Sequence, residues 1–141
     1  MLQQLGLHHL AGEQGCGLVL VDGPPGIGCP AIAAVSGADL LLAVTEPTLS
    51  GKHDMERVAE LTRLFGIPAM VCVNKWDLYP TVAEEIETDA LDRGMKVAGR
   101  VRYDKAVTKA QVVRTSVVEY TGGAITEEIK SVWRHVQYAL G

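Results

Sequence analysis

An acidic residue followed by a glycine- and proline-rich loop stands near the start of the chain, in Asp22-Gly-Pro-Pro-Gly-Ile-Gly28. The apolar run Gly17–Asp22 predicts a buried β-strand, so Asp22 would stand at a strand end. A carboxylate placed there can hold the hydration shell of Mg²⁺, and the backbone N–H of Gly26 can approach a terminal phosphate because no Cβ is in the way. The alternative is a structural turn in which the two prolines set φ.

A second polar cluster, Asn74-Lys75-Trp76-Asp77, follows the apolar run Pro68–Asn74. An Asn and an Asp three residues apart at a strand end can hydrogen-bond the edge of a purine, and the stem of a lysine between them can lie along the base. Asn-Lys-x-Asp also serves as ordinary turn chemistry. The preceding loop strengthens the binding interpretation, because both clusters follow predicted strands. Asp77 could also accept from a guanine edge, so adenine and guanine both stay open.

Apolar runs and amphipathic segments alternate along the whole chain. Strands are predicted over Gly17–Asp22, Asp39–Thr45, Pro68–Asn74 and, more weakly, Lys96–Val101. The connections are long enough to hold helices, which favours a mainly parallel sheet in a three-layer α/β/α domain. Ligands bind such sheets at the carboxyl ends of the strands. The candidate positions therefore follow Val21, Thr45, Val73 and Val101.

Three helices are predicted between and after these strands. The first covers Ser50–Phe65 and ends at Gly66, the second opens with the capping-box pattern Thr81-x-x-Glu84 and stops at Gly94, and the third is C-terminal. Their expected apolar stripes are Met55, Val58, Leu61 and Leu64 in the first, Val82, Ile86 and Leu91 in the second, and Ile125, Ile129, Val132, Val136 and Leu140 in the third.

The composition sets limits on the class of protein. The 141 residues are 48% hydrophobic with a formal charge of −4, which favours one core-forming domain and offers no basic surface for nucleic acid. The longest apolar stretch, Cys29–Val44, is too short and too interrupted to cross a membrane and is expected to be buried. No secretory signal opens the chain, and its three cysteines lack a Cys-x-x-Cys spacing. We therefore expect a cytoplasmic protein without a disulfide framework.

Three segments in this order carry a family resemblance: Val21-Asp-Gly-Pro-Pro-Gly26, Val44-Thr-Glu-Pro47 and Val73-Asn-Lys75. They resemble the C-terminal half of the MinD/ParA/Mrp (SIMIBI) group of P-loop ATPases, which includes the nucleotide-binding domains of cobyrinic acid a,c-diamide synthases (CobQ/CobB). The chain is most similar to MinD-superfamily ATPases that carry an inserted ferredoxin domain. The resemblance covers nearly the whole chain from residue 17 to residue 140.

The resemblance implies roles for the two loops described above. Asp22 would be the Walker B carboxylate, which meets Mg²⁺ through water, and Gly26 would be the switch II glycine that senses the γ-phosphate. Asn74 would contact the adenine, with Lys75 and Asp77 beside it.

The loop after the last predicted strand would also pass near the base. In this chain the loop is Val101-Arg-Tyr-Asp104, so Arg102 and Tyr103 would be its base-proximal residues. The family usually has proline where this chain has Arg102, and the path of the loop is therefore open.

The phosphate-cradling loop of this ATPase group is absent from the sequence. Gly51-Lys52 is the only Gly-Lys pair, but the pattern also needs a glycine at Glu46 and a hydroxyl residue at His53. We therefore interpret it as the first turn of a helix. Ferredoxin-type cysteine runs are missing as well, and both features would lie upstream of Met1.

These absences define the expected function. Residues 1–141 are expected to form a single, partial nucleotide-binding domain, the C-terminal portion of a MinD/Mrp-like ATPase, with ATP and Mg²⁺ bound by the complete protein. An iron–sulfur cluster would belong to the missing upstream part. Alone, the chain should bind nucleotide weakly or not at all, because the missing loop supplies most phosphate contacts. Whether this chain is itself an enzyme stays open.

The absent loop also has a structural consequence. In this ATPase group the phosphate-loop strand lies beside the strand that ends at Asp22. Without it, we expect the chain either to pair its strands differently or to cover the open edge by self-association or with an upstream segment of the same protein.

Two other interpretations remain. Gly26-x-Gly28-x-x-Ala31 matches a dinucleotide-binding pattern, and Glu46 falls 20 residues after Gly26, where a ribose-binding acid would stand. Alternatively, the chain could be a non-catalytic remnant or interaction module with the same fold.

Overall fold

The computed structural model describes residues 17–23 and 37–141. Its elements follow one another as β1 (Leu41–Thr45), α3 (Leu49–Phe65), β2 (Ala69–Asn74), the 3₁₀ turn η1 (Trp76–Leu78), α4 (Pro80–Asp92), β3 (Lys96–Val101), α5 (Ala106–Val112), α6 (Val117–Tyr120) and α7 (Ala124–Leu140).

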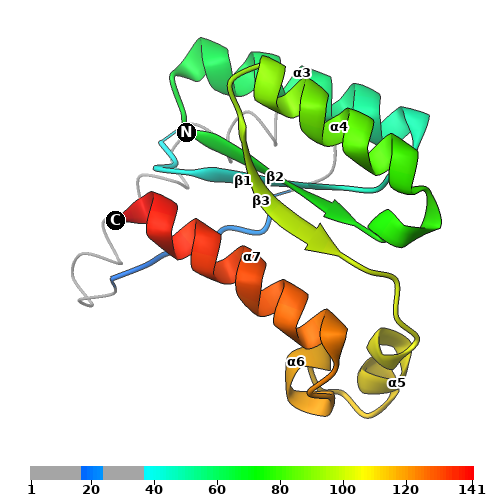
Figure 1. The fold of residues 1–141 in the computed structure, drawn as a ribbon. Helices are drawn as coiled ribbons and strands as arrows, with labels where there is room; N and C mark the ends of the chain where they lie inside the picture. Colours follow the sequence, from blue (N-terminus) through cyan, green and yellow to red (C-terminus); the bar gives the residue numbers. More distant parts are fainter. Residues whose placement is uncertain (1–16, 24–36) are drawn as a thin grey trace.

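The described strands form one parallel sheet in the order β1-β2-β3. Helices α3 and α4 cover one face of this sheet and α7 crosses the other face (Figure 1). The three-layer α/β/α class predicted from the sequence is therefore confirmed. The three predicted strands that follow residue 37 are confirmed as well, with boundaries that differ by at most two residues.

The strand predicted over Gly17–Asp22 is wrong. Residues 17–23 have no regular secondary structure, and the four apolar side chains from Leu18 to Val21 are exposed. A parallel strand satisfies its N–H and C=O groups only by pairing with a neighbour, and no described strand pairs with this segment. The expected re-pairing of the remaining strands does not occur among the described residues.

The core consists of two clusters, one on each face of β2. Val71 and Val73 face α3 and α4, and Met70 and Cys72 face α7. Every residue of β2 from Ala69 to Val73 is buried, because helices cover both faces and a strand lies on each side. The sheet is therefore organised around its middle strand.

Helix α3 has the predicted length but a different buried face. Thr48 caps its first turn, and Gly66 ends it in the left-handed conformation with φ 65°. The buried residues are Met55, Ala59 and Thr62, whereas Val58 and Leu61 are half-buried and Leu64 is 78% exposed. The stripe predicted at three-residue spacing is wrong beyond Met55, because a 3.6-residue period carries residues three apart steadily away from the sheet.

The other helices match the sequence more closely. Helix α7 buries Ile125, Val132 and Val136, as its stripe predicts, but leaves Leu140 exposed. Helix α4 buries Ile86, leaves Leu91 exposed and begins at Pro80 without a side-chain cap, so the predicted capping box at Thr81 is wrong. A proline at the first helical position is already pre-set in φ and has no N–H to satisfy.

The prediction that Cys29–Val44 is a buried segment is wrong for the end of β1, which lies in the described part of the chain. Leu42 and Val44 on β1 are 37% and 62% exposed. Residues 29–36 lie outside the described part of the chain.

A β-bulge interrupts the pairing of β2 with β3. Val71 pairs with Val97, but Cys72 pairs with Gly99, so Ala98 has no opposite residue. The carbonyl oxygen of Ala98 accepts a hydrogen bond from Nδ1 of His135, 2.6 Å away on α7. The next residue, Gly99, has a φ of 141° that other residues rarely adopt. A Cβ there would also lie 3.1 Å from Cγ2 of Val132.

We expect Gly99→Ala to lower the free energy of unfolding by roughly 1–3 kcal/mol, because alanine would be strained at this φ and would press on α7. Urea denaturation followed by circular dichroism measures the change. Gly122→Ala is the matched control and should change stability by about 0.5 kcal/mol or less, since its added Cβ meets nothing within 4 Å. Equal effects in both variants would contradict the role given to the bulge.

The thiol of Cys72 should be unreactive in the folded protein. Burial, with the charges of Glu87 and Glu128, raises its pKa to about 11. In a Cys16→Ser, Cys29→Ser background, a disulfide reagent at pH 8 should label native Cys72 about two orders of magnitude more slowly than the urea-unfolded chain. Similar labelling rates in the two states would show that α7 does not cover this part of β2.

Candidate functional site

The three strands are parallel, so their carboxyl ends lie together at one end of the sheet. Polar residues follow each strand there. Glu46 follows β1, Asn74 ends β2 and Lys75 comes directly after it, and Arg102 follows β3. Open parallel sheets bind ligands at this edge. The structure therefore gathers the predicted base-binding residues at one end of the molecule.

Lys75 connects the ends of β1 and β2. Its backbone is in the left-handed conformation, with φ 56°, and begins the 3₁₀ turn η1. Its Nζ lies 2.6 Å from Oε1 of Glu46, and both side chains are partly exposed. The lysine stem therefore spans the gap between two strand ends, with its charge balanced by a carboxylate.

Asp77 connects the loops after β2 and β3. Its Oδ1 accepts a hydrogen bond of 2.7 Å from the backbone N–H of Tyr103, which fixes the start of the second loop against the first. The side chain of Asn74 makes no hydrogen bond to the described residues and is half-buried. The Tyr103 side chain is 48% exposed. An amide and an aromatic ring beside a fixed loop are thus available to a ligand.

Arg102 is held by Glu128, at the start of α7. The backbone N–H of Arg102 donates to Oε2 of Glu128 at 2.8 Å, and its Nε and Nη2 donate to Oε1 at 3.0 and 2.7 Å. Burial alone would raise the pKa of Glu128, but the hydrogen bonds from Arg102 outweigh it and lower that pKa. The same pairing raises the pKa of Arg102. Arg102 therefore anchors its loop to α7.

Trp76 begins the 3₁₀ turn η1 and contacts a charged group. The guanidinium carbon of Arg100 is 5.4 Å from its ring centroid, and Arg100 also forms a bidentate pair with Glu87 at 2.7 and 2.6 Å. The indole Nε1 is buried without a partner at hydrogen-bond geometry, yet its proximity to Glu128 helps to lower that residue's pKa. Trp76 is therefore a packing residue, set against the core cluster between the sheet and helices α3 and α4.

Of the residues predicted for magnesium and phosphate, only Asp22 lies in the described part of the chain. Asp22 is exposed and makes no hydrogen bond or ion pair with the described residues, and Gly26 lies outside them. No group of three or more His, Cys, Asp or Glu side chains within residues 17–23 and 37–141 could hold a metal ion. No helix in the same ranges is both long and apolar enough to cross a bilayer.

The interpretation of Gly51-Lys52 as a helix turn is confirmed. The hydroxyl of Thr48 accepts from the backbone N–H of Gly51 at 2.9 Å in the first turn of α3. A Cβ at position 51 would stand 2.3 Å from the carbonyl oxygen of Glu46, which explains the glycine. Lys52 pairs with Glu85 and Asp89 of α4, each at 3.1 Å.

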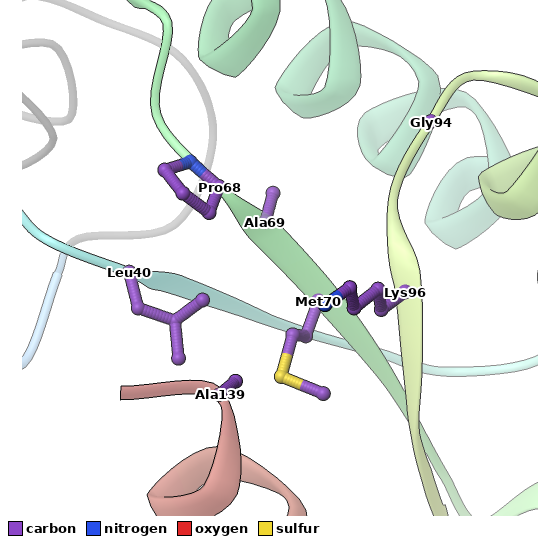
Figure 2. Close-up of a pocket in the computed structure, with 7 residues that line it drawn as sticks. All are labelled: Leu40, Pro68, Ala69, Met70, Gly94, Lys96 and Ala139. Carbon is purple, nitrogen blue, oxygen red and sulfur yellow. The ribbon is translucent and has the colours of Figure 1, made fainter. Parts of the chain in front are cut away.

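A small cavity lies at the opposite, amino-terminal end of the sheet (Figure 2). It measures about 80 Å³ and is lined mainly by residues with apolar side chains, of which Leu40, Met70 and Ala139 meet near Lys96. Sites for ligands of nucleotide size measure roughly 300–1,000 Å³. The cavity is therefore a packing gap beside the end of α7.

Sequence reasoning missed two carboxylates of the site. Glu128 lies 26 residues after Arg102, and Glu87 lies 13 residues before Arg100. Both lie on helices among other acidic residues, and such a group is typical of a helix face exposed to solvent. An arginine just beyond a strand end needs a counter-charge, but nothing in the sequence shows which of the many glutamates supplies it.

The sequence is similar to parts of two archaeal proteins, and no protein-family model matches it. The uncharacterized protein MJ0578 of Methanocaldococcus jannaschii is 41% identical over 58 residues, which are 41% of this chain and 21% of that protein. MJ0579 of the same organism is 31% identical over 66 residues, 47% of this chain and 24% of that protein. The chain thus spans about a quarter or less of these relatives.

The structure is similar to those of MinD cell division proteins. Aquifex aeolicus MinD in complex with MinC superposes with a TM-score of 0.78 at 22% identity, covering 94% of this chain and 56% of that chain. Pyrococcus horikoshii MinD with Mg-ADP gives 0.73 at 16%, covering 92% and 55%. The cell division ATPase MinD of Pyrococcus furiosus gives 0.72 at 17%, covering 86% and 52%.

These likenesses, at 16–22% identity, concern the fold. This chain spans little more than half of each MinD structure, but nearly all of its own length is matched. The chain therefore has the P-loop NTPase-like fold of the MinD ATPases over the part that it spans.

Proposed function

We propose that this chain is the base-recognition part of a MinD-like ATPase, its C-terminal portion. The observation that carries the proposal is the hydrogen bond between Asp77 and the backbone of Tyr103, in a chain whose fold matches MinD. That bond joins the loops after β2 and β3 at the strand ends where a ligand is expected. It leaves Asn74 and the Tyr103 ring free of protein partners among the described residues.

Each residue of the group has a distinct role in the proposal. Asn74 offers a donor and an acceptor to the edge of a purine, and the stem of Lys75 lies along the base while Glu46 balances its charge. Asp77 positions the second loop through Oδ1, so a base that paired with both oxygens would have to share that atom with the N–H of Tyr103. This favours adenine over guanine, whose edge asks for two acceptors. Tyr103 supplies a ring for contact with the base.

Magnesium and phosphate would be held mainly by residues beyond the described group. Asp22 fits one role, a carboxylate that meets the ion through water, but one exposed side chain cannot hold Mg²⁺ alone. Bound magnesium would neutralise phosphate charge, as in other phosphoryl-transfer sites. Hydrolysis is therefore proposed only for a complete protein with a phosphate loop, with Gly26 as its γ-phosphate sensor.

The finer assignment rests on the sequence resemblance alone. We place the chain with the ATPases that carry an inserted ferredoxin domain, whose nucleotide cycle would serve iron–sulfur or electron-transfer work in the cytoplasm. The DNA upstream of Met1 tests this assignment. An in-frame phosphate loop and ferredoxin cysteines would support it, whereas a stop codon would favour a remnant or interaction module of the same fold.

The dinucleotide alternative receives no support from the described residues. Glu46, the acid that would bind a ribose, is instead paired with Lys75. The glycines of that pattern lie outside the described residues.

Nucleotide titrations test the base-binding role directly. In amide NMR spectra, we expect adenosine at millimolar concentration to shift the signals of Asn74 and Tyr103, and guanosine to shift them less. Mg-ATP should bind no more than a few-fold more tightly than adenosine, because this chain lacks the loop that supplies phosphate contacts. The variant Asn74→Ala should lose the adenosine response.

Two outcomes would contradict the proposal in different ways. Micromolar binding of Mg-ATP, measured by calorimetry, would show that the site is already complete. Shifts produced equally by adenosine and by ribose would show that Asn74 does not read the base.

The anchoring of the second loop by Glu128 gives a pH-dependent prediction. Because the folded state lowers the pKa of Glu128, its carboxylate stabilises the fold above the ordinary value of 4.5, and this contribution is lost as the pH falls through the folded pKa. Glu128→Gln should therefore lower the free energy of unfolding at pH 7 by roughly 0.5–1 kcal/mol. The effect is small because solvent screens the pair. The difference from the parent should shrink below pH 4.5.

Glu127→Gln is the matched control for this experiment. Glu127 is the exposed neighbour and pairs only with Lys130 among the described residues, at 3.2 Å. Urea unfolding of both variants at pH 7 and pH 3.5 measures the effect, and exchange of the Arg102 amide should accelerate only in Glu128→Gln. A loss of stability independent of pH would contradict the ionic role of Glu128.

A further inference from the structure

The bulge in β3 changes which face of the sheet the later residues of the strand occupy. In a regular strand, residues an even number of positions apart point to the same face. Val97 and Val101 are four positions apart, yet Val97 packs against the core cluster of α3 and α4, whereas Val101 packs against the cluster of α7. The extra residue at the bulge, Ala98, accounts for this change of face.

Arg100 is the residue that the bulge places on the side of α4. It pairs in register with Val73, whose side chain belongs to the cluster of α3 and α4, and paired residues on neighbouring strands share a face. In a strand without the bulge, Arg100 would be an odd number of positions from Val97 and would face α7 instead. The bulge therefore directs this arginine toward α4.

Two contacts fix the guanidinium group of Arg100. Its Nε and Nη2 donate to the two carboxylate oxygens of Glu87 on α4, at 2.7 and 2.6 Å, and its Cζ lies over the ring of Trp76. The side chains of Arg100 and Glu87 are only 29% and 15% exposed. A planar group held by two parallel hydrogen bonds has one orientation, so the indole of Trp76 packs against a fixed surface.

Trp76 begins the turn that carries residues of the proposed base site. Turn η1 is closed by one backbone hydrogen bond, from the N–H of Leu78 to the carbonyl of Lys75, at 3.1 Å. Lys75 is in the left-handed conformation, which residues other than glycine seldom adopt, and no side chain of the described residues caps the start of the turn. So short a turn has little stability of its own, and the packing of Trp76 holds it.

We propose that Arg100 is a positioning residue for the base site. Glu87 orients the guanidinium, the guanidinium orients the indole of Trp76, and the indole holds η1, so that Asn74 and Asp77 are in place before a base arrives. The inference rests on the proposed function for the identity of the ligand. A preformed site binds more tightly because less conformational freedom is lost on binding.

Amide hydrogen exchange of the full 141-residue chain, followed by NMR without ligand, tests the positioning. Arg100→Lys keeps the positive charge but lacks the planar, bidentate group. We expect the amides of Leu78 and Tyr103 to exchange about tenfold faster in this variant, beyond any change in the amides of β2, which report on global unfolding. Glu87→Gln should act in the same direction, because it weakens the hold on the guanidinium.

Arg93→Lys is the matched control for the exchange experiment. Arg93 follows α4 and pairs with Glu56 and Glu60 of α3, at 3.5 and 3.8 Å. It should leave the Leu78 and Tyr103 amides unchanged. Equal acceleration of the η1 and β2 amides in Arg100→Lys would overturn the proposal, because it would show that Arg100 only stabilises the fold. Unchanged exchange in both Arg100→Lys and Glu87→Gln would overturn it as well.

An adenosine titration separates this inference from the proposed function. Where the parent chain responds to adenosine, Arg100→Lys should raise the Kd by about fivefold. An unchanged Kd would overturn the positioning role and leave the proposed function intact. A parent chain without any response would contradict the proposed function, and the exchange rates alone would then decide whether Arg100 holds the turn.

Discussion

The burial of β2 is the constraint on which the rest of the structure depends. Its backbone pairs on both sides and its side chains are covered on both faces, so the strand cannot shift without breaking both core clusters. Once β2 is fixed, parallel pairing fixes where β1 and β3 end. The polar residues that follow the strands are therefore brought together by the core rather than by contacts among themselves.

Carboxylates then fix the loops that leave the strand ends. Glu46 pairs with Lys75 in the loop after β2, and Asp77 and Glu128 both hold the loop after β3 by accepting from its backbone N–H groups. Such bonds restrict the loop backbone while leaving neighbouring side chains free. The loops at the strand ends are therefore held by carboxylates, while Asn74 and the ring of Tyr103 keep no hydrogen-bond partner among the described residues.

Strong local patterns made most of the fold predictable. Continuous apolar runs predicted β1 and β2, and the apolar stripe of α7 predicted most of its buried face. The Gly17–Asp22 run is similarly apolar, but no described strand pairs with it, and a sequence pattern cannot show whether a neighbouring strand is present. The prediction of the buried face of α3 was wrong because it was based on large apolar residues such as Leu61 and Leu64. The residues that are buried include a small one, Ala59, and a polar one, Thr62. At the site, Asn74 to Asp77 could be found by spacing, whereas Glu128 depends on how α7 packs.

The link between Arg102 and Glu128 also bears on how such sequences diverge. A proline at position 102 would lack both the backbone N–H and the guanidinium that donate hydrogen bonds to Glu128. A glutamate at 128 would then be left half-buried without a partner, and an arginine at 102 without the glutamate would lose its anchor. Neither residue is advantageous alone, so the two positions should be inherited together as a pair that crosses from the sheet to the last helix.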